Sequence, residues 1–345
     1  MRSELPPLLD VGDLGDYLDD RLPGEGPFSV DRHLAGHSNE TFRIARSGHT
    51  WILRRPPRGA FLPSAHDVER EFTVLNGLAG TSVRAPKPLL MCPDEDVIGA
   101  PFYVMEYIDG FVIRNALPET FGAPERYRIG AELVDALVEL HSVDPASCGL
   151  GSFGRPHGYL ERQLRRWTGQ LELTLPLTRP LPELENAGEW LGANLPASNA
   201  HTLVHGDYKL DNVSFSAYPP ARLIAIFDWE MSTLGDPLAD LGWMISFWRE
   251  EGDPADDVFA ELNRVTTLPG FAQRAELIDR YERATGRDAG RLGWYEVLAT
   301  WKLAILLEGS YARHLAGATD DPFFAEMEYR VPALARRAVD LAGRS

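Results

Sequence analysis

Two short polar segments, each beside an apolar run, constrain this chain more than any other feature. The first reads His-Gly-Asp-Tyr-Lys-Leu-Asp-Asn over residues 205–212, and the second begins with Asp228, 21 residues after Asp207. Asp207, Asn212 and Asp228 together offer the kind of oxygen ligands that hold Mg²⁺ on a nucleotide and orient a hydroxyl. We therefore predict a centre for phosphoryl transfer, in which these three side chains converge on a metal-bound triphosphate between two lobes.

Each polar residue of this centre has its own predicted role. Asp207 can accept or orient the proton of an attacking hydroxyl, and Lys209 can neutralise charge on the phosphoryl group. Asn212 and Asp228 are the predicted Mg²⁺ ligands, because an amide carbonyl and a carboxylate are hard oxygen donors. Any one of these residues alone is compatible with a capped turn, but three such positions beside strand-like runs favour a catalytic centre.

A glycine-containing hairpin is predicted near the start of the chain, after an amphipathic helix over residues 8–21. Two β-like runs are joined there by Ala-Gly-His-Ser-Asn-Glu over residues 35–40. Gly36 has no Cβ, so this turn can bring backbone N–H groups and the small side chains of Ser38 and Asn39 close to a phosphate chain. An ordinary hairpin is the alternative interpretation of the segment.

The strand predicted over residues 51–55 carries a candidate phosphate-facing cation. Alternation along a strand places Ile52 and Arg54 on the same face. A helix predicted to begin at Ser64 follows, and its spacing places Glu71 within the buried stripe. Because a buried carboxylate requires a cationic partner, we predict an ion pair between Glu71 and Arg54. A solvated helix edge is the alternative for Glu71.

A boundary between two lobes is predicted where the apolar strand over residues 102–108 ends at Asp109 and Gly110. Exposed backbone groups at such a crossing can read the edge of an adenine, although a simple linker is the alternative. The prediction assigns residues 1–105 to an N-terminal nucleotide-binding lobe and residues 106–110 to a hinge. Residues 111–345 form the predicted C-terminal lobe, with the catalytic loop and the acceptor pocket.

The rest of the chain is predicted to be mainly helical, which together with the N-terminal strands gives an α+β class. Apolar residues at helical spacing predict helices over residues 124–142, 159–173, 243–250, 271–285, 292–308 and 323–341. A Pro-rich connector is expected between the first lobe's helix and its last strand. The aromatic residues of the C-terminal helices, including Trp243, are predicted to be mostly core, and Asp240 is expected to buttress the catalytic loop.

Length and composition narrow the classes of protein further. The chain has 345 residues, 44% of them hydrophobic, which is enough for two lobes without disulfides or repeats. Two distant cysteines, the lack of a membrane-spanning apolar run and the lack of a secretory leader predict a soluble cytoplasmic protein with no membrane partner. A formal net charge of −17 argues against nucleic-acid binding. The oligomeric state is left open.

Nearly the whole chain resembles the aminoglycoside/choline phosphotransferase family, and more narrowly the phosphotransferase domains related to those fused to acyl-CoA dehydrogenases. The motifs that carry the resemblance lie at residues 36–41, 53–57, 70–71, 205–212, 228–230 and 234–241. The resemblance implies a protein-kinase-like two-lobed fold, with a small antiparallel-sheet N-lobe that has one main helix, and a larger, mostly helical C-lobe. It implies ATP, with GTP as an alternative, and Mg²⁺ as cofactors. It also suggests that Glu106 and Ile108, with Met105 beside them, supply backbone contacts to the base.

The same resemblance assigns roles to individual residues. It implies Asp207 as the catalytic base, and Asn212 and Asp228 as the Mg²⁺ ligands. Arg54 and Glu71 stand in place of the usual Lys–Glu pair. An arginine at this position keeps the charge but turns a point charge into a planar fork, which changes the geometry toward phosphate.

The acceptor is predicted to be a small molecule rather than a protein. Only seven residues separate Asp228 from Asp236, where a helix is expected to begin, and this is too few for the activation loop and peptide platform of a protein kinase. An aminoglycoside-like antibiotic fits the acidic surface. A hydroxyacyl-CoA or similar metabolite fits the narrower resemblance and the basic helix that carries Arg162, Arg165 and Arg166. The sequence leaves both acceptors open.

A nucleotide-binding regulatory module that has lost catalysis is the second hypothesis. Arg54 in the lysine position keeps this hypothesis open. The intact Asp207, Asn212 and Asp228 argue against it.

Overall fold

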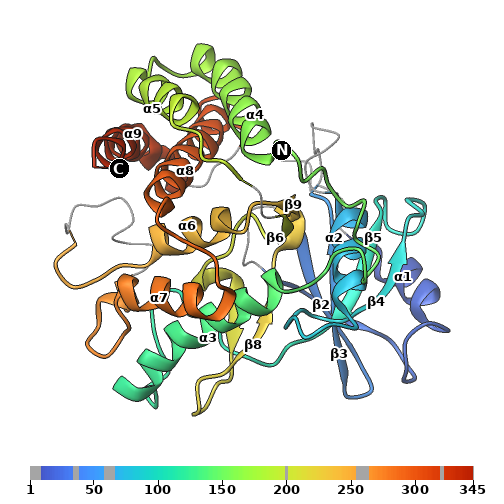
Figure 1. Cartoon of the computed structure of the whole chain (residues 1–345). Helices are drawn as coiled ribbons and strands as arrows, with labels where there is room; N and C mark the ends of the chain where they lie inside the picture. The colour runs from blue at the N-terminus through green and yellow to red at the C-terminus, as the bar shows by residue number, and fades with distance from the viewer. Residues whose placement is uncertain are drawn as a thin grey trace. The chain divides into compact units, whose positions relative to one another are not determined.

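The computed structural model describes residues 9–33, 39–57, 67–198, 201–253, 264–318 and 322–344. The chain divides into two compact units, of which unit 1 comprises residues 1–109 with 224–230, and unit 2 comprises residues 110–223 with 231–345. Unit 1 contains an antiparallel sheet and unit 2 is mostly helical (Figure 1), so the predicted α+β class is confirmed.

Unit 1 is built on a five-stranded sheet in which every neighbouring pair is antiparallel, in the order β1-β2-β3-β5-β4. The bounds of its strands are Ser29–His33 for β1, Glu40–Arg46 for β2, His49–Arg55 for β3, Pro88–Cys92 for β4 and Phe102–Glu106 for β5. Its two α-helices are α1, Val11–Leu18, and α2, Val68–Leu78.

The two faces of this sheet bury different helices, because successive side chains of a strand point to opposite faces. On one face, Leu53 and Val104 pack in a core with Leu14 of α1, and each of these side chains is fully buried. Burial of one such side chain contributes about 1.5–3 kcal/mol. Tyr103 points to the other face, where its ring lies 6.0 Å from that of Phe72 in α2. The second face is therefore the one that brings α2 against the sheet.

The predicted Pro-rich connector is wrong, because its residues Pro88–Cys92 form the edge strand β4. An edge strand tolerates proline, since the outer side of the strand needs no N–H donor. The register of β4 also shifts between Pro88 and Leu90. Helix α2 begins at Val68, with the carboxylate of Asp67 accepting the Arg70 N–H as an N-cap, whereas the predicted start at Ser64 lies outside the described residues.

Unit 2 consists mainly of helices packed around α8. The α-helices are α3, Ala123–His141; α4, Tyr159–Thr174; α5, Pro182–Ala193; α6, Leu238–Phe247; α7, Arg274–Thr285; α8, Leu292–Leu315; and α9, Met327–Ala342. Helix α5 was not predicted. Helices α6 and α8 pack closely at Gly242, since a Cβ added there would lie 2.5 Å from the Cβ of Tyr295 in α8. A side chain at position 242 would therefore force these two helices apart.

Short strands accompany the central loop of the chain. Strands β6, Thr202–Val204, and β9, Thr233–Gly235, pair antiparallel in unit 2, and the loop that follows β6 carries residues 205–212. Strand β7 spans Val213–Phe215, and β8 spans Leu223–Ile226 and leads to Asp228. No helix in the described part of the chain is both long and apolar enough to cross a membrane.

Candidate functional site

An ion pair between strand β3 and helix α2 is the centre of the site in unit 1. Nη1 of Arg54 donates to Oε1 of Glu71 across 2.6 Å, and both residues are buried. Burial by itself lowers the pKa of Arg54, but Glu71, Tyr103, Asp228 and Glu230 together outweigh it and the pKa lies above its usual value. Arg54 is therefore a permanent cation on this face of the sheet, and the pairing predicted from strand and helix spacing is present.

Asp228 and Trp229 join this pair through the segment that follows β8. The backbone N–H of Trp229 donates to Oε1 of Glu71 at 3.3 Å, and Nη2 of Arg54 lies 3.6 Å from Oδ1 of Asp228. Asp228 has φ of 66°, a left-handed conformation that aspartate tolerates better than most residues. This backbone turn places the Asp228 carboxylate beside the Arg54–Glu71 pair.

The residues predicted to hold Mg²⁺ have oxygen atoms that suit a hard cation. Oδ1 of Asp228 is buried and has no hydrogen-bond partner among the described residues. The amide nitrogen of Asn212 donates to Asp207, which leaves the Asn212 carbonyl oxygen as the atom that can bind a metal. Each side chain thus fits the predicted ligand role. Asn212 belongs to unit 2 and Asp228 to unit 1, so their convergence stays a prediction.

The other residues predicted to bind the nucleotide are only partly placed. Gly36 and Ser38 lie outside the described residues. Asn39 is buried, and its amide nitrogen lies 3.5 Å from Oε2 of Glu71. Its carbonyl oxygen has no partner within the described ranges. We call Asn39, Arg54, Glu71 and Asp228 the unit 1 cluster.

The end of β5 forms the start of the predicted hinge. Met105 is buried in β5 and pairs with the half-buried Ile52 of β3, whereas Ile108 follows the strand. The backbone N–H of Glu106 donates to the carbonyl of Lys87 at 2.9 Å, and its carboxylate accepts the Lys87 N–H at 2.8 Å. The Glu106 N–H is therefore engaged within the sheet, and the predicted base contacts stay a prediction.

In unit 2, the carboxylate of Asp207 is held by three side chains. Nζ of Lys209 donates to both Asp207 oxygens at 2.8 Å, and the amide of Asn212 donates to Oδ2 at 2.7 Å. The indole Nε1 of Trp243 donates to Oδ1 at 2.7 Å. These donors arrive from the catalytic loop and from α6, so the carboxylate orientation is fixed within unit 2.

The electrostatics of Asp207 follow from these contacts. Burial alone raises its pKa, but Lys209, Lys302 and His205 together outweigh burial, and the net pKa is lowered. A carboxylate of low pKa is a weak proton acceptor. Asp207 is therefore better suited to orient a hydroxyl by hydrogen bonding than to store its proton.

Trp243 is a site residue that the sequence prediction missed, because its indole was expected to be core. It lies three residues after Asp240 in α6, so the two side chains share one face of the helix. Since Asp240 was predicted to support the catalytic loop, the same spacing was a signal for Trp243.

Asp240 supports the loop over residues 205–212, as predicted. Its carboxylate accepts the backbone N–H of His205 at 2.6 Å and that of Gly206 at 2.7 Å. Nε2 of His141 lies 3.2 Å from Asp240, and Nδ1 of His141 lies 2.8 Å from the hydroxyl of Tyr281. Burial lowers the pKa of His141, whereas the His141 contact helps to lower that of Asp240 against burial. A neutral imidazole therefore links the loop to α7.

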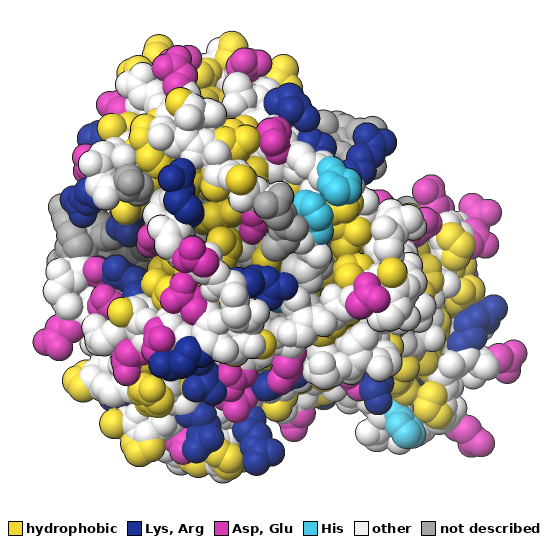
Figure 2. Space-filling view, in the orientation of Figure 1, with side chains coloured by type: hydrophobic (Ala, Val, Ile, Leu, Met, Phe, Trp, Pro, Cys, Tyr) yellow, Lys and Arg dark blue, Asp and Glu magenta, His cyan; other side chains and the backbone are white. Residues whose placement is uncertain are grey.

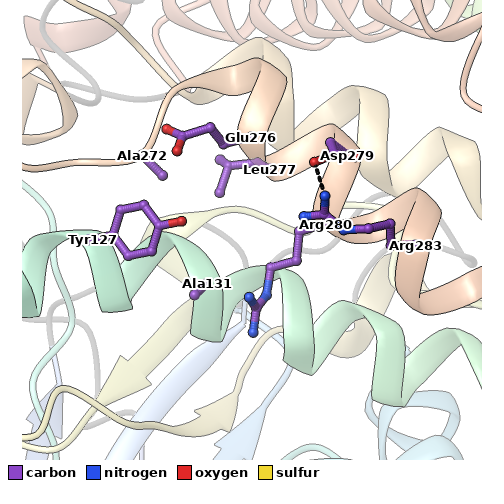
Figure 3. Close-up of a pocket in the computed structure, with 8 residues that line it drawn as sticks. All are labelled: Tyr127, Ala131, Ala272, Glu276, Leu277, Asp279, Arg280 and Arg283. Carbon is purple, nitrogen blue, oxygen red and sulfur yellow. Dashed lines mark ion pairs between the residues drawn. The ribbon is translucent and has the colours of Figure 1, made fainter.

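A surface pocket of unit 2 lies between α3 and α7, and none of the predicted site residues lines it (Figure 3). Arg280 donates to both oxygens of Asp135 at 2.7 Å, and Arg283 pairs with Asp279. Basic and acidic side chains stand next to each other over these helices (Figure 2). Its two arginines are already paired, so this pocket is not the candidate site.

Comparison with known proteins identifies the family of the chain. The family model for phosphotransferase enzymes matches residues 29–295. The chain is 35% identical over 351 residues to acyl-CoA dehydrogenase family member 11 of Rattus norvegicus, which covers 97% of this chain and 44% of that relative. This chain thus spans about half the length of that protein.

Solved structures agree with this match. A Ralstonia eutropha protein assigned to the aminoglycoside phosphotransferases is 32% identical, with a TM-score of 0.81, and the match covers 97% of this chain and 99% of that one. Choline kinase of Cryptosporidium parvum is 11% identical with a TM-score of 0.63, over 97% of this chain and 95% of that one, and it shares the fold. The resemblance and the protein-kinase-like fold expected from the sequence are confirmed, and the chain belongs to the phosphotransferase enzyme family.

Proposed function

We propose that this chain is an ATP- and Mg²⁺-dependent kinase that transfers the γ-phosphate to a hydroxyl of a small molecule. The observation that carries the proposal is the Asp207 carboxylate, which Lys209, Asn212 and Trp243 hold in one orientation. A carboxylate fixed in this way can align an incoming hydroxyl, and alignment of reactants is a main source of rate acceleration in phosphoryl transfer.

The residues of the chain divide the work of the reaction. Asp207 accepts a hydrogen bond from the acceptor hydroxyl and directs its oxygen toward phosphorus, while Lys209 offsets negative charge on the transferring group. In unit 1, the Arg54 guanidinium, held by Glu71, binds phosphate oxygens. Asn212 and Asp228 would hold Mg²⁺, which would neutralise negative charge on the nucleotide phosphates.

The remaining nucleotide contacts are assigned by position. Gly36, Ser38 and Asn39 are proposed to line the phosphate chain. Backbone groups of the hinge, residues 106–110, are proposed to read the base. The proposed base site also includes Ile52, Met105, Glu106 and Ile108.

Two acceptor classes fit the proposal. The acidic surface favours a polycationic aminoglycoside, whereas the relationship to an acyl-CoA dehydrogenase family member favours a hydroxyacyl-CoA. In the basic helix α4, Arg162 donates to the backbone carbonyls of Arg155 and His157, and Arg166 lies 5.1 Å from the ring of Trp167. Arg162 is thus committed to the fold, which weakens but does not remove the case for an anionic acceptor.

A transfer screen tests the proposed function directly. The protein is incubated with Mg²⁺ and [γ-³²P]ATP, then with [γ-³²P]GTP, across aminoglycosides, hydroxyacyl-CoAs and other hydroxylated metabolites. The expected result is a labelled small-molecule product that is lost in Asp207→Ala and Asp228→Ala, with both variants folded by circular dichroism. Full activity in either variant contradicts the assignment, and a labelled protein without a labelled small molecule contradicts the acceptor class.

A nucleotide-binding regulatory module is the second candidate, because Arg54 replaces the usual lysine. Calorimetry with MgATP gives binding under both proposals and does not separate them. Binding without transfer to any member of the panel supports the regulatory module. A variant Arg54→Lys that gains transfer activity adds direct support for it.

A further inference from the structure

Lysine is rare in this chain, and two of its lysines lie at Asp207. The sequence contains 34 basic residues of the Lys and Arg types, but only Lys87, Lys209 and Lys302 are lysines. Lys209 already has a role in the proposed function. Lys302 has no role in it so far. It lies in α8, far from Asp207 in sequence.

The ammonium group of Lys302 is buried between aromatic rings. The residue is 8% exposed, and its Nζ lies 4.3 Å from the ring of Trp243 and 5.7 Å from that of Trp167. The same Nζ donates to the backbone carbonyl of Gly206 at 2.7 Å. A buried charge is costly unless it is paired or hydrogen-bonded, so the chain retains this ammonium against a considerable desolvation penalty.

Two of the contacts of Lys302, those with Gly206 and Trp243, lead to Asp207. The Gly206 carbonyl belongs to the peptide group that immediately precedes Asp207, so the ammonium fixes the plane of that peptide. Gly206 has φ of 85°, and a Cβ there would lie 2.7 Å from the carbonyl oxygen of Met231, so only glycine fits at this position next to Asp207. The Trp243 indole, which faces Lys302, donates to Oδ1 of Asp207.

We propose that Lys302 is a positioning residue for phosphoryl transfer, which holds the Asp207 carboxylate through the Gly206 carbonyl and the Trp243 indole. This inference rests on the proposed function of the chain. Lys302 acts through these two groups, so its loss lowers kcat and leaves the KM for ATP nearly unchanged.

The charge of Lys302 is sensitive to pH. Burial lowers its pKa to about 8, although the carboxylates of Asp207 and Asp240 act in the opposite direction. Arg166 of α4 and Lys209 of the catalytic loop face the same ammonium and lower the pKa further. The cation is thus present at neutral pH and lost above pH 8, and kcat is expected to fall with it.

Two variants test the role of Lys302 in activity. Lys302→Met removes the cation at similar volume, and Lys302→Arg keeps a charge that does not titrate below pH 12. We expect kcat of Lys302→Met to fall about 10²-fold, the loss typical of a misplaced catalytic group. We expect Lys302→Arg to regain part of kcat without the decline above pH 8. Lys87→Met, at an exposed lysine, is the matched control and keeps wild-type kcat.

Nuclear magnetic resonance gives a readout that needs no activity. Protein labelled with ¹⁵N at the lysine Nζ and the tryptophan indole has three lysine signals, and the one absent from Lys302→Arg should titrate near pH 8. The indole signal of Trp243, assigned with Trp243→Phe, should shift with the same midpoint. If the wild-type protein transfers no phosphate, the proposed function fails while this titration still stands.

Two results overturn the role of Lys302. One is wild-type kcat in a folded Lys302→Met together with an unchanged pH profile. The other is a Lys302 titration that leaves the Trp243 indole signal unmoved. If Lys302→Met does not fold, the pH profile of Lys302→Arg decides, and a retained decline of kcat above pH 8 counts against the proposal.

Discussion

In unit 2 the carboxylate of Asp207 accepts hydrogen bonds from three side chains, whereas in unit 1 Oδ1 of Asp228 has none among the described residues. Two further buried atoms of unit 1, Oδ1 of Asn39 and Nε of Arg54, also have no hydrogen-bond partner within the described ranges. A buried polar group without a partner costs about 1–3 kcal/mol. The hydrogen bonds of the fold thus fix the Asp207 carboxylate. The buried polar atoms of the unit 1 cluster would find their partners in the proposed phosphate and metal.

The largest effect is expected where the fold has set the geometry. Asp207→Asn keeps the shape of the side chain but removes its charge, so it weakens the hydrogen bond that aligns the acceptor hydroxyl. We expect kcat to fall about 10²-fold or more, the loss typical of a misaligned reacting group. Steady-state kinetics with the acceptor found in the screen measure the loss.

Asp211→Asn is the matched control for this prediction. Asp211 lies in the same loop, and burial raises its pKa rather than lowering it. It makes no hydrogen bond to Asp207 among the contacts described above, so its variant should retain most of kcat. Equal losses in both variants would remove the distinction between Asp207 and its neighbouring carboxylate.

Loss of an ion pair in the unit 1 cluster is expected to lower the free energy of unfolding. Glu71→Ala leaves Arg54 buried without its ion-pair partner at 2.6 Å, and the carboxylate of Asp228 lies farther away, at 3.6 Å. Breaking a buried ion pair by removing one partner costs about 3–5 kcal/mol. Denaturant unfolding should show this loss, and calorimetry should show weaker binding of MgATP.

Glu69→Ala sharpens the test, because Glu69 is exposed on the same helix. A surface substitution away from special features changes stability by about 0.5 kcal/mol or less. If Glu69→Ala and Glu71→Ala destabilise the protein to the same extent, the Arg54–Glu71 pair is not what holds α2 to the sheet.

The difference between the two units also separates what the sequence predicts from what it does not. The pairing of Arg54 and Glu71 follows from local periods, since strand alternation and the helical stripe place both residues on facing surfaces. The motif over residues 205–212 and Asp228 also stand out from spacing alone. Spacing along the sequence thus predicts the Arg54–Glu71 pair of unit 1 and identifies the loop residues of unit 2.

The contact of Asp207 with Trp243 of α6 and the contact of Gly206 with Lys302 of α8 have a different origin. Trp243 and Lys302 lie in apolar helices whose sequence reads as core. Apart from the spacing of Trp243 from Asp240, only the packing of α6 against α8 shows that they face the loop over residues 205–212. No local pattern encodes that packing. Edge strand β4 was missed for a related reason, because its proline, Pro88, is compatible with a strand only when one side has no neighbour.

The pH dependence of stability provides a smaller effect that isolates Lys302. Its folded-state pKa of about 8 lies below the unfolded value near 10.5, so the unfolded chain binds more protons between these values. Stability contributed by this group therefore rises with pH across the window, by roughly 1–2 kcal/mol between pH 7.5 and 9.5. Urea unfolding at both pH values measures the change.

Lys302→Met lacks this titrating group and should show a flatter profile over the same range. The difference between the two proteins cancels the contributions of other groups that titrate there. If the stability of Lys302→Met depends on pH as steeply as that of the wild-type protein, the ammonium keeps its ordinary pKa. The rings of Trp167 and Trp243 then do not desolvate it.

The smallest effect is expected at an exposed ion pair of the same sheet that carries Arg54. Arg32 on β1 and Glu40 on β2 approach to 2.7 Å, as close as Arg54 and Glu71, but the Arg32 side chain is 48% exposed. Surface pairs contribute about 0–1 kcal/mol, because water screens the charges and both side chains lose freedom when they pair. Glu40→Gln should therefore lower the free energy of unfolding by less than about 1 kcal/mol and lose its effect in 1 M salt. The loss in Glu71→Ala should persist in that salt, since a buried pair is poorly screened, and a salt-sensitive loss there would show that solvent reaches the Arg54 guanidinium.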